Sequence, residues 1–466
     1  MINKQNSIVN FNETKRLSEI RSRIRFLVAE FSRIKYQETI FVAGDTPIPP
    51  SGKLLGVEEL SNLVDSSLDG WLTTGRFNDA FECELKKYLN SKYVLTTNSG
   101  SSANLLALSA LTSPKLGDKA LKLGDEVIAV AAGFPTTVNP ILQCGLIPVF
   151  VDVELETYNI DTDLIETAIS DKTRAIMIAH TLGNPFNIEK VLAIAQKYNL
   201  WVIEDTCDAL GSTYTVNNDI TTATKIKIKA GEPRLVGTFG HIGTLSFYPA
   251  HHITMGEGGA VFTDSKKLQL IIESMRDWGR DCYCDPGHDN TCNKRFEWSL
   301  GELPEGYDHK YIYSHLGYNL KITDMQASCG LAQLKKLDMF IQQRKNNFLY
   351  LKTQLKSCEK YLILPEATVN SDPSWFGFAI TLRDNSPISR VELLKKLDHY
   401  NIGSRLLFAG NVTCQPYMKD RKYRISGSLI NTDKIMHNTF WIGVQPALVQ
   451  SMLDYIVNVF EDIFLT

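Results

Sequence analysis

Two adjacent histidines offer the most direct acid–base chemistry in this 466-residue chain. His251 and His252 end the segment Ser246-Phe247-Tyr248-Pro249-Ala250-His251-His252. An imidazole whose unperturbed pKa lies near ~6.5 accepts or releases a proton at neutral pH. Either ring therefore suits a general base, and their adjacency leaves the choice between them open.

Three cysteines form a second chemical group. Cys282, Cys284 and Cys292 fall within eleven residues of a polar stretch, and the chain has nine cysteines in all. An odd number of cysteines in a large enzyme-like chain argues against a disulfide framework. Four thiolates hold an iron-sulfur cluster or a structural zinc ion, so three imply a fourth ligand from elsewhere. The spacing alone does not distinguish the two metals.

A third group suits the binding of a phosphate and a pyridine ring. Gly100, Ser101 and Ser102 precede the helical run Leu105–Leu111, and such a start presents backbone N–H groups to a phosphate or is simply an N-cap. Asp205 follows an apolar run, and a carboxylate there can keep a pyridine nitrogen protonated. Phe134 can stack on such a ring, although an aromatic beside a strand is more often core.

The elements that must position these residues alternate between strand-like and helical patterns. This alternation predicts an α/β fold with a mainly parallel sheet, whose ligands gather at the carboxyl ends of the strands. Asp205 and Ser246 end two of the runs. The predicted strands are Val127–Val130, Pro148–Val153, Ala175–Ala179, Leu200–Ile203, Thr244–Phe247 and Ala260–Thr263.

Three parts of the chain are expected. Residues 1–56 contain an N-terminal helix over Lys15–Glu38, whose apolar residues share one face, and a proline-rich loop. Residues 57–335 form the large cofactor-binding domain, with a cysteine loop at about 281–296 and a polar surface insertion at about 216–236. Residues 336–466 form a smaller α+β domain, with helical patterns in Leu331–Leu355 and Val449–Phe464.

Composition is that of an ordinary soluble enzyme. The formal charge of -3 gives no basic excess for nucleic-acid binding, and no apolar run reaches the ~20 residues of a membrane span. Met1–Arg16 is polar and lacks the apolar centre of a secretory signal. We therefore expect a cytoplasmic protein with neither nucleic-acid nor membrane partners.

Taken in order from about Gly75 to Asn411, these segments resemble the sugar aminotransferase and dehydratase family that uses pyridoxal phosphate. The resemblance implies the aspartate-aminotransferase fold, a PLP-dependent transferase of fold type I. It also implies that Gly100, Ser101, Ser102 and Ser246 surround the cofactor phosphate. By the same likeness Phe134 stacks on the ring, Asp205 pairs with its nitrogen and Asp208 lies near it.

One position departs from the family's aminotransferases, which carry a lysine where this chain has His251. Imidazole forms no stable Schiff base, so the departure disfavours transamination. With histidine at this position, the chain resembles the family's 3-dehydratases of 4-keto-6-deoxy nucleotide sugars, which work from pyridoxamine phosphate. The resemblance makes His251 the base that helps the C3 hydroxyl depart, with His252 as its competitor. Tyr248 either tunes a ring-centred radical or merely packs.

The Cys-x-Cys-x₇-Cys arrangement is similar to the iron-sulfur branch of these dehydratases. That likeness implies CDP-4-keto-6-deoxy-D-glucose as substrate, and Cys207 as fourth ligand of a 2Fe-2S cluster with Cys282, Cys284 and Cys292. The cluster would pass two electrons, one at a time, from a separate flavin and iron-sulfur reductase. A homodimer is expected by the same resemblance.

Other interpretations stay open. A cluster-free GDP-sugar dehydratase also carries the histidine, a sugar aminotransferase requires the missing lysine, and a catalytically silent scaffold would only bind nucleotide sugar. Arg405 and Asn411 are candidate substrate residues because a guanidinium suits phosphate oxygens. A surface salt bridge is an equally good interpretation of the arginine.

Overall fold

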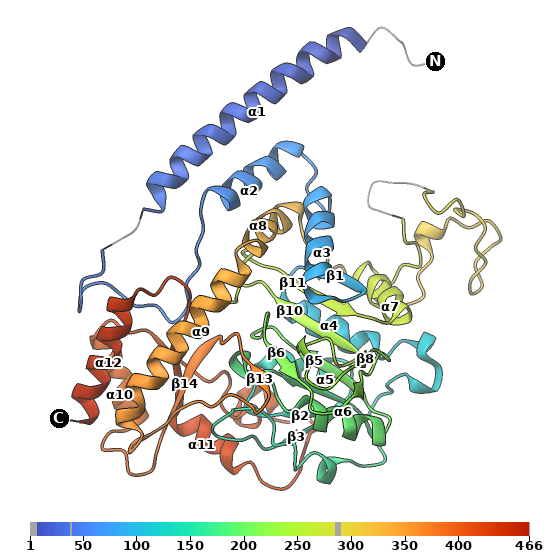
Figure 1. The fold of residues 1–466 in the computed structure, drawn as a ribbon. Helices are drawn as coiled ribbons and strands as arrows, with labels where there is room; N and C mark the ends of the chain where they lie inside the picture. Colours follow the sequence, from blue (N-terminus) through green and yellow to red (C-terminus); the bar gives the residue numbers. More distant parts are fainter. Residues whose placement is uncertain (1–6, 38–39, 285–289, 466) are drawn as a thin grey trace.

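A mixed eight-stranded sheet is the centre of the computed structural model, which describes residues 7–37, 40–284 and 290–465 (Figure 1). Its strand order is β1-β11-β10-β5-β4-β2-β3-β16, and the pairs from β10 to β16 are parallel, whereas β11 runs antiparallel to both neighbours. The strands are β1 (Tyr93–Thr97), β2 (Glu126–Val130), β3 (Ile147–Val151), β4 (Thr173–Ala179), β5 (Trp201–Asp205), β10 (Ile242–Ser246), β11 (Gly259–Thr263) and β16 (Arg424–Ile425).

All six predicted strands are present in this sheet, within a few residues of the predicted bounds. Sequence reasoning missed β1 and β16. Strand side chains alternate between two cores, as the pleat requires: Val127 and Ala129 of β2 join one core, and Ile128 and Val130 join the other.

Helices cover both faces of the sheet, so its strands are buried on both sides. One face packs against α4 (Gly100–Ala110), α5 (Pro135–Gln143) and α7 (Lys266–Arg276). The other packs against α6 (Ile188–Lys197). Near β1 and β11, a smaller apolar cluster joins α3 (Arg76–Leu89) to α8 (Asp324–Leu334).

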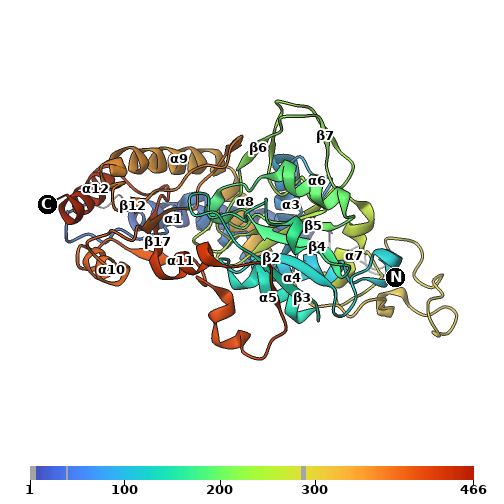
Figure 2. The ribbon, with the colours of Figure 1, turned by 90° about the horizontal axis from the view of Figure 1, so that it is seen from below.

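The second domain has its own antiparallel sheet, of order β12-β14-β17-β15, and its own core (Figure 2). Its strands are β12 (Leu362–Ile363), β14 (Gly377–Leu382), β15 (Ser404–Leu406) and β17 (Thr439–Gly443). Its helices are α9 (Leu337–Gln354), α10 (Arg390–His399), α11 (Ile430–Asn438) and α12 (Gln450–Phe464). The predicted helical pattern of Leu331–Leu355 covers the end of α8 and all of α9.

The chain does not divide as simply as the three predicted parts. Ile48, in the N-terminal loop, is buried in the core of the smaller domain. Conversely, β16 adds to the edge of the large sheet, where Arg424 forms an ion pair with Glu126 at 2.7 Å. Each domain therefore includes a segment from outside its predicted bounds.

The predicted insertion at 216–236 is built into the large domain. It holds β7 (Ile220–Thr221), β8 (Lys227–Ile228) and β9 (Pro233–Leu235), and β9 pairs with β6 (Thr213–Thr215), itself beside β13 (Ser371–Asp372). Val216, Ile228 and Val236 are buried against the core of the α6 face. Most of its exposed residues are polar, as expected, but three buried apolar side chains anchor it.

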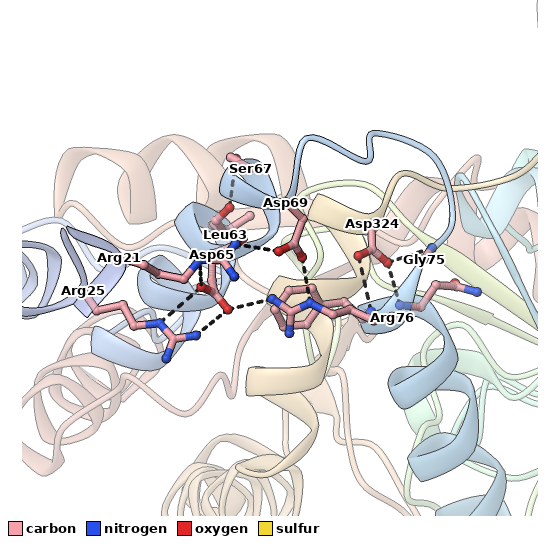
Figure 3. Close-up of polar contacts among 11 residues, drawn as sticks. Arg21, Arg25, Leu63, Asp65, Ser67, Asp69, Gly75, Arg76 and Asp324 are labelled. Carbon is pink, nitrogen blue, oxygen red and sulfur yellow. Dashed lines mark hydrogen bonds and ion pairs between the residues drawn. The ribbon is translucent and has the colours of Figure 1, made fainter. Parts of the chain in front are cut away.

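The N-terminal helix α1 (Ser7–Lys35) lies outside both domains, beside α2 (Val57–Asp69) (Figure 1). Arginines hold it there: Arg25 lies 2.5 Å and Arg21 3.1 Å from the buried Asp65, which also binds Arg76 of α3 (Figure 3). The start of α3 is held in turn by Asp324 of α8, which accepts hydrogen bonds from the backbone N–H groups of Gly75 and Asn78 (Figure 3).

Within residues 7–37, 40–284 and 290–465, no helix combines the length and the apolar character needed to cross a membrane.

Candidate active site

A cavity of about 770 Å³ opens at the carboxyl ends of β5 and β10, between the large sheet and the smaller domain. Such an edge is where open α/β sheets bind ligands. The large domain contributes the start of α4, the turn after β2 and the segment after β10. The smaller domain contributes Phe376, Arg405 and Trp441.

The N-terminus of α4 faces this cavity through Gly100 and Ser101, both of which line it together with Ser246. Gly100 is needed for the close approach, because a Cβ there would lie 2.3 Å from the Cβ of Ser246. Ser102 does not line the cavity: its N–H donates to Ser99 Oγ at 3.1 Å and its hydroxyl to Asn98 Oδ1 at 2.6 Å. Free N–H groups and hydroxyls at this helix end form a cradle suited to a phosphate.

Asp205 is buried at the end of β5 with its carboxylate fixed by three donors. Asn104 Nδ2 and Thr137 Oγ1 each donate to one oxygen at 2.7 Å, and the N–H of Cys207 donates to the other at 3.1 Å. Asn104 is held by a 2.6 Å hydrogen bond from the Thr244 hydroxyl. A carboxylate oriented in this way can accept a hydrogen bond from a protonated pyridine nitrogen. Neither Asn104 nor Thr137 was predicted.

Phe134 has the exposure that a stacking residue requires. Its side chain is 51% exposed and lines the cavity, and its edge contact with Phe408 has ring centroids 5.9 Å apart. This exposure excludes the alternative interpretation that Phe134 is a core residue.

His251 lines the same cavity as Asp205, and two neighbours define its position. Its Nδ1 lies 3.4 Å from a carboxylate oxygen of Asp208, and its ring tilts against Phe376 at a centroid distance of 5.2 Å. The buried guanidinium of Arg344, on α9, donates to the carbonyls of His251 at 3.4 Å and Phe376 at 3.1 Å. Arg344 lies far away in sequence and carried no motif that would have singled it out.

His252 points away from the cavity. It is only 2% exposed and does not line the cavity, and its Nε2 donates to the carbonyl of Ser374 at 3.3 Å. Burial, with the charge of nearby Arg344, holds the pKa of His252 well below its ordinary value. Of the two adjacent histidines, only His251 can reach a molecule in the cavity.

The remaining candidates divide between the cavity and the protein interior. Tyr248 is 51% exposed and lines the cavity, as does the exposed Arg405, whose guanidinium donates to the carbonyl of Ser404. Asn411 is buried and does not line it. Its Nδ2 donates to Asp433 at 2.7 Å and its Oδ1 accepts from the N–H of Thr413 at 3.0 Å, so its amide is used in the fold.

Cys207 is separated from the other three predicted metal ligands. It lines the cavity beside Asp205, and burial, aided by the negative charge of Asp205, raises the pKa of its thiol well above the ordinary value. Cys282, Cys284 and Cys292 lie instead on a long loop that extends from the body next to α7 (Figure 1).

The three loop cysteines surround His309, which sequence reasoning missed. His309 Nε2 lies 3.1 Å from the Sγ of Cys282, 3.8 Å from that of Cys284 and 3.7 Å from that of Cys292. Cys282, Cys284 and His309 offer ligand atoms that all lie within 4.8 Å of one another. A histidine distant from the cysteines in sequence gives no spacing signal, because only the folded loop joins them.

The sequence profile of the DegT/DnrJ/EryC1/StrS aminotransferase family matches residues 54–461, nearly the whole of the two domains. The chain belongs to this family. The matched span includes the serine-rich start of α4, Asp205 at the end of β5 and Ser246 at the end of β10.

Two relatives are similar along most of their length. The chain is 63% identical to the lipopolysaccharide biosynthesis protein RfbH of Salmonella typhimurium, covering 96% of this chain and 98% of that protein. It is 50% identical to dTDP-4-dehydro-2,6-dideoxy-D-glucose 3-dehydratase of Saccharopolyspora spinosa, covering 96% of this chain and 92% of that protein.

A solved structure confirms the predicted fold. The E. coli GDP-4-keto-6-deoxy-D-mannose-3-dehydratase with bound hydrated PLP matches with a TM-score of 0.76 and 28% identity, covering 88% of this chain and 98% of that chain. The family member described here thus has the aspartate-aminotransferase-like architecture of fold type I.

Proposed function

We propose that this protein is a pyridoxamine-phosphate-dependent 3-dehydratase of a 4-keto-6-deoxy nucleotide sugar, CDP-4-keto-6-deoxy-D-glucose. The observation that carries the proposal is the position of His251: an imidazole faces Asp208 in a cavity which, in the described part of the chain, has no lysine among its lining residues. Lys225, Lys227 and Lys229 are exposed on the insertion and do not line the cavity. The lysine that a sugar aminotransferase requires is therefore missing from this cavity.

The residues that line the cavity fit pyridoxal phosphate or pyridoxamine phosphate. The α4 cradle, which a Cβ at Gly100 would fill, suits the phosphate, Asp205 suits the ring nitrogen and Phe134 suits the ring face. When bound, the cofactor supplies an amine for the C4 ketone and a ring that disperses negative charge.

His251 provides the proton transfer. Nδ1 of His251 lies 3.4 Å from a carboxylate oxygen of Asp208, so we assign Nε2 as the atom that accepts a proton from the reacting centre and returns it to the departing C3 hydroxyl. Asp208 lies beside the ring, and Arg344 donates a hydrogen bond to the backbone carbonyl of His251. Tyr248 lies at the rim, where its phenol can contact the sugar.

The loop cysteines would hold the group that supplies the reducing step. Loss of the hydroxyl would leave an unsaturated sugar that must gain two electrons, and a 2Fe-2S cluster held by this loop would supply one-electron transfer from a flavin and iron-sulfur reductase. Thiolates at Cys282, Cys284 and Cys292 are suitable ligands for such a cluster.

The nucleotide requires its own test, because the relatives are named for dTDP and GDP sugars. We expect turnover when the protein meets pyridoxamine phosphate, a reductant and CDP-4-keto-6-deoxyglucose, with a deoxygenated product identified by mass. The matched dTDP and GDP substrates are the controls. Turnover of the GDP sugar with release of ammonia would instead indicate the cluster-free type of dehydratase, which deaminates its product.

Metal analysis tests the reducing step. Protein purified without oxygen is expected to be brown and to contain iron and sulfide, and Cys292→Ser to lose both. A colourless wild-type protein that holds zinc would contradict the iron-sulfur part of the proposal and leave the dehydration untouched. A protein whose absorption spectrum stays unchanged when substrate meets pyridoxamine phosphate would be a silent scaffold.

A further inference from the structure

A second cavity lies at the opposite end of β1 and β11 from the candidate active site. Its volume is about 470 Å³, within the range of about 300–1,000 Å³ that is typical of small-molecule sites. Tyr93 at the start of β1 and Asp264 just after β11 line it, whereas Gly100, beyond the end of β1, lines the active-site cavity. A five-residue strand is about 17 Å long, so the two cavities are separate.

This second cavity has an excess of positive charge. Three cations from different segments line it, namely Lys86 near the end of α3, Lys92 before β1 and Arg234 on β9. Lys266 adds a fourth at the border, since its Nζ lies 5.2 Å from the ring centroid of Tyr93. Asp264 is the one carboxylate among the described residues that line the cavity. In the described part of the chain it forms an ion pair with Arg234, whereas neither lining lysine forms one.

Arg234 is fixed in direction but incompletely neutralised. Its side chain is only 15% exposed, and its Nε donates to Thr238 Oγ1 at 2.7 Å. Its carboxylate partner, Asp264, lies 3.5 Å from Nη2 and also accepts the backbone N–H of Lys92 at 2.7 Å. Burial lowers the pKa of Arg234, so Asp264 offsets only part of the cost of burying this charge. Within the described residues Nη1 has no hydrogen-bond acceptor, which leaves it available to a further anion.

These donors suit a diphosphate group. A guanidinium binds two phosphate oxygens at once, and lysines act as flexible point charges that can meet a second phosphoryl group. A single carboxylate would leave part of this positive charge unmatched. Tyr93 and Ile226 line the same cavity and offer apolar surface to a base or sugar ring attached to the phosphates.

We propose that this cavity binds the diphosphate group of a nucleotide or a nucleotide sugar, at a site separate from the active site. Ile226 and Arg234 both belong to the 216–236 insertion, so the insertion forms one wall of the site, and the end of α3 with the start of β1 forms the other. A bound diphosphate thereby links the insertion to α3. Binding there does not depend on the reaction at His251 or on the nature of the metal centre.

Titration calorimetry with sodium pyrophosphate tests the site, on the full chain loaded with pyridoxamine phosphate so that the α4 cradle is occupied. We expect one saturable site, whose dissociation constant rises at least about tenfold in the double variant Lys86→Gln with Lys92→Gln and likewise in Arg234→Gln. Both lysines are exposed, so their replacement tests the site even if Arg234→Gln fails to fold. Lys122→Gln with Lys172→Gln is the matched control, since both residues are exposed lysines, and it should bind like the wild type.

Hydrogen exchange locates the bound pyrophosphate. We expect slower exchange in residues 86–93 and 226–235 and no change in residues 99–104. Unchanged exchange in the first two segments, or equal affinities in the lysine variant and its control, would overturn the proposal. Cytidine diphosphate distinguishes the two sources of the group. If it slows exchange in the same segments at a concentration at least about tenfold lower than pyrophosphate, the site recognises a nucleotide, whereas equal concentrations show that the diphosphate alone is recognised.

Discussion

His251 occupies a position that backbone contacts and a carboxylate determine together. Arg344 donates to its carbonyl, Phe376 borders its ring and Asp208 faces Nδ1 at 3.4 Å. These contacts hold the ring at the cavity wall, whereas the adjacent His252 turns into the interior. The two adjacent side chains point in different directions, so the structure identifies which histidine faces the cavity, a choice that the sequence leaves open.

His251→Asn tests the role of the imidazole. Asparagine keeps a polar group of similar size but cannot accept a proton near neutral pH, so we expect turnover to fall by about 10²–10⁴-fold. The affinity for pyridoxamine phosphate, measured by absorbance titration, should stay within a few-fold of the wild type because the phosphate cradle and Asp205 are untouched. Undiminished turnover would refute the assignment.

At the scale of elements, phosphate binding depends on the close packing of the start of α4 against the end of β10. A Cβ on Gly100 would lie 2.3 Å from the Cβ of Ser246, so Gly100→Ala must push the helix start away from the strand end. We expect the dissociation constant for pyridoxamine phosphate to rise at least about tenfold, equivalent to ~1.4 kcal/mol. Gly56→Ala is the control, since its nearest neighbour would be 3.7 Å away. Equal affinities in both variants would contradict the cradle.

The attachment of α1 depends on two carboxylates of α2, the buried Asp65 and also Asp69, which lies 2.6 Å from Arg21. Asp65 forms ion pairs with Arg21, Arg25 and Arg76, and its side chain is 4% exposed (Figure 3). Asp65→Asn removes the charge while keeping the shape. A hydrogen bond to a charged group contributes about 1.5–3 kcal/mol, so we expect the free energy of opening α1 from α2 to fall by about that amount. Hydrogen exchange over residues 13–35 measures it, and unchanged protection there would show that other contacts hold the helix.

The same network predicts how this attachment responds to acid. Burial alone would raise the pKa of Asp65, but hydrogen bonds from Arg25 and Arg76 outweigh it and hold the pKa below the ordinary 3.8. A carboxyl with a lowered folded-state pKa stabilises the attachment fully above its unfolded value, and the contribution is lost as pH falls through the folded value. Protease cleavage within α1 should therefore be constant from pH 7 to about 5 and rise below about 3.8. Asp65→Asn should reduce this dependence but not abolish it, because Arg21 also forms an ion pair with Asp69.

At the scale of the molecule, α1 presents an apolar surface that the single chain does not cover. Leu27, Phe31 and Ile34 are 60%, 60% and 65% exposed and share one face of the helix. We propose that the homodimer expected from the family resemblance covers them. Full burial of a leucine or phenylalanine contributes about 1.5–3 kcal/mol, so Leu27→Glu with Phe31→Glu should weaken self-association at least about a hundredfold.

Light scattering after size-exclusion chromatography measures this association. Ser22→Glu adds charge on the opposite side of α1 and should leave the dimer intact. A double variant that stays dimeric at the same concentration would place the subunit interface elsewhere.

The sequence by itself determined the fold class, the six inner strands and several residues that line the cavity on the large domain, because each of these depends on local pattern or on a short motif. The periodicity of apolar residues predicts strands and helices, and a serine-rich helix start or an aspartate after a strand keeps its chemistry wherever the sheet places it. Only the tertiary structure decided which histidine faces the cavity, that Asn411 is used in the fold, and that His309 lies among the loop thiols. These depend on side-chain direction and on contacts between distant segments, which no local pattern encodes.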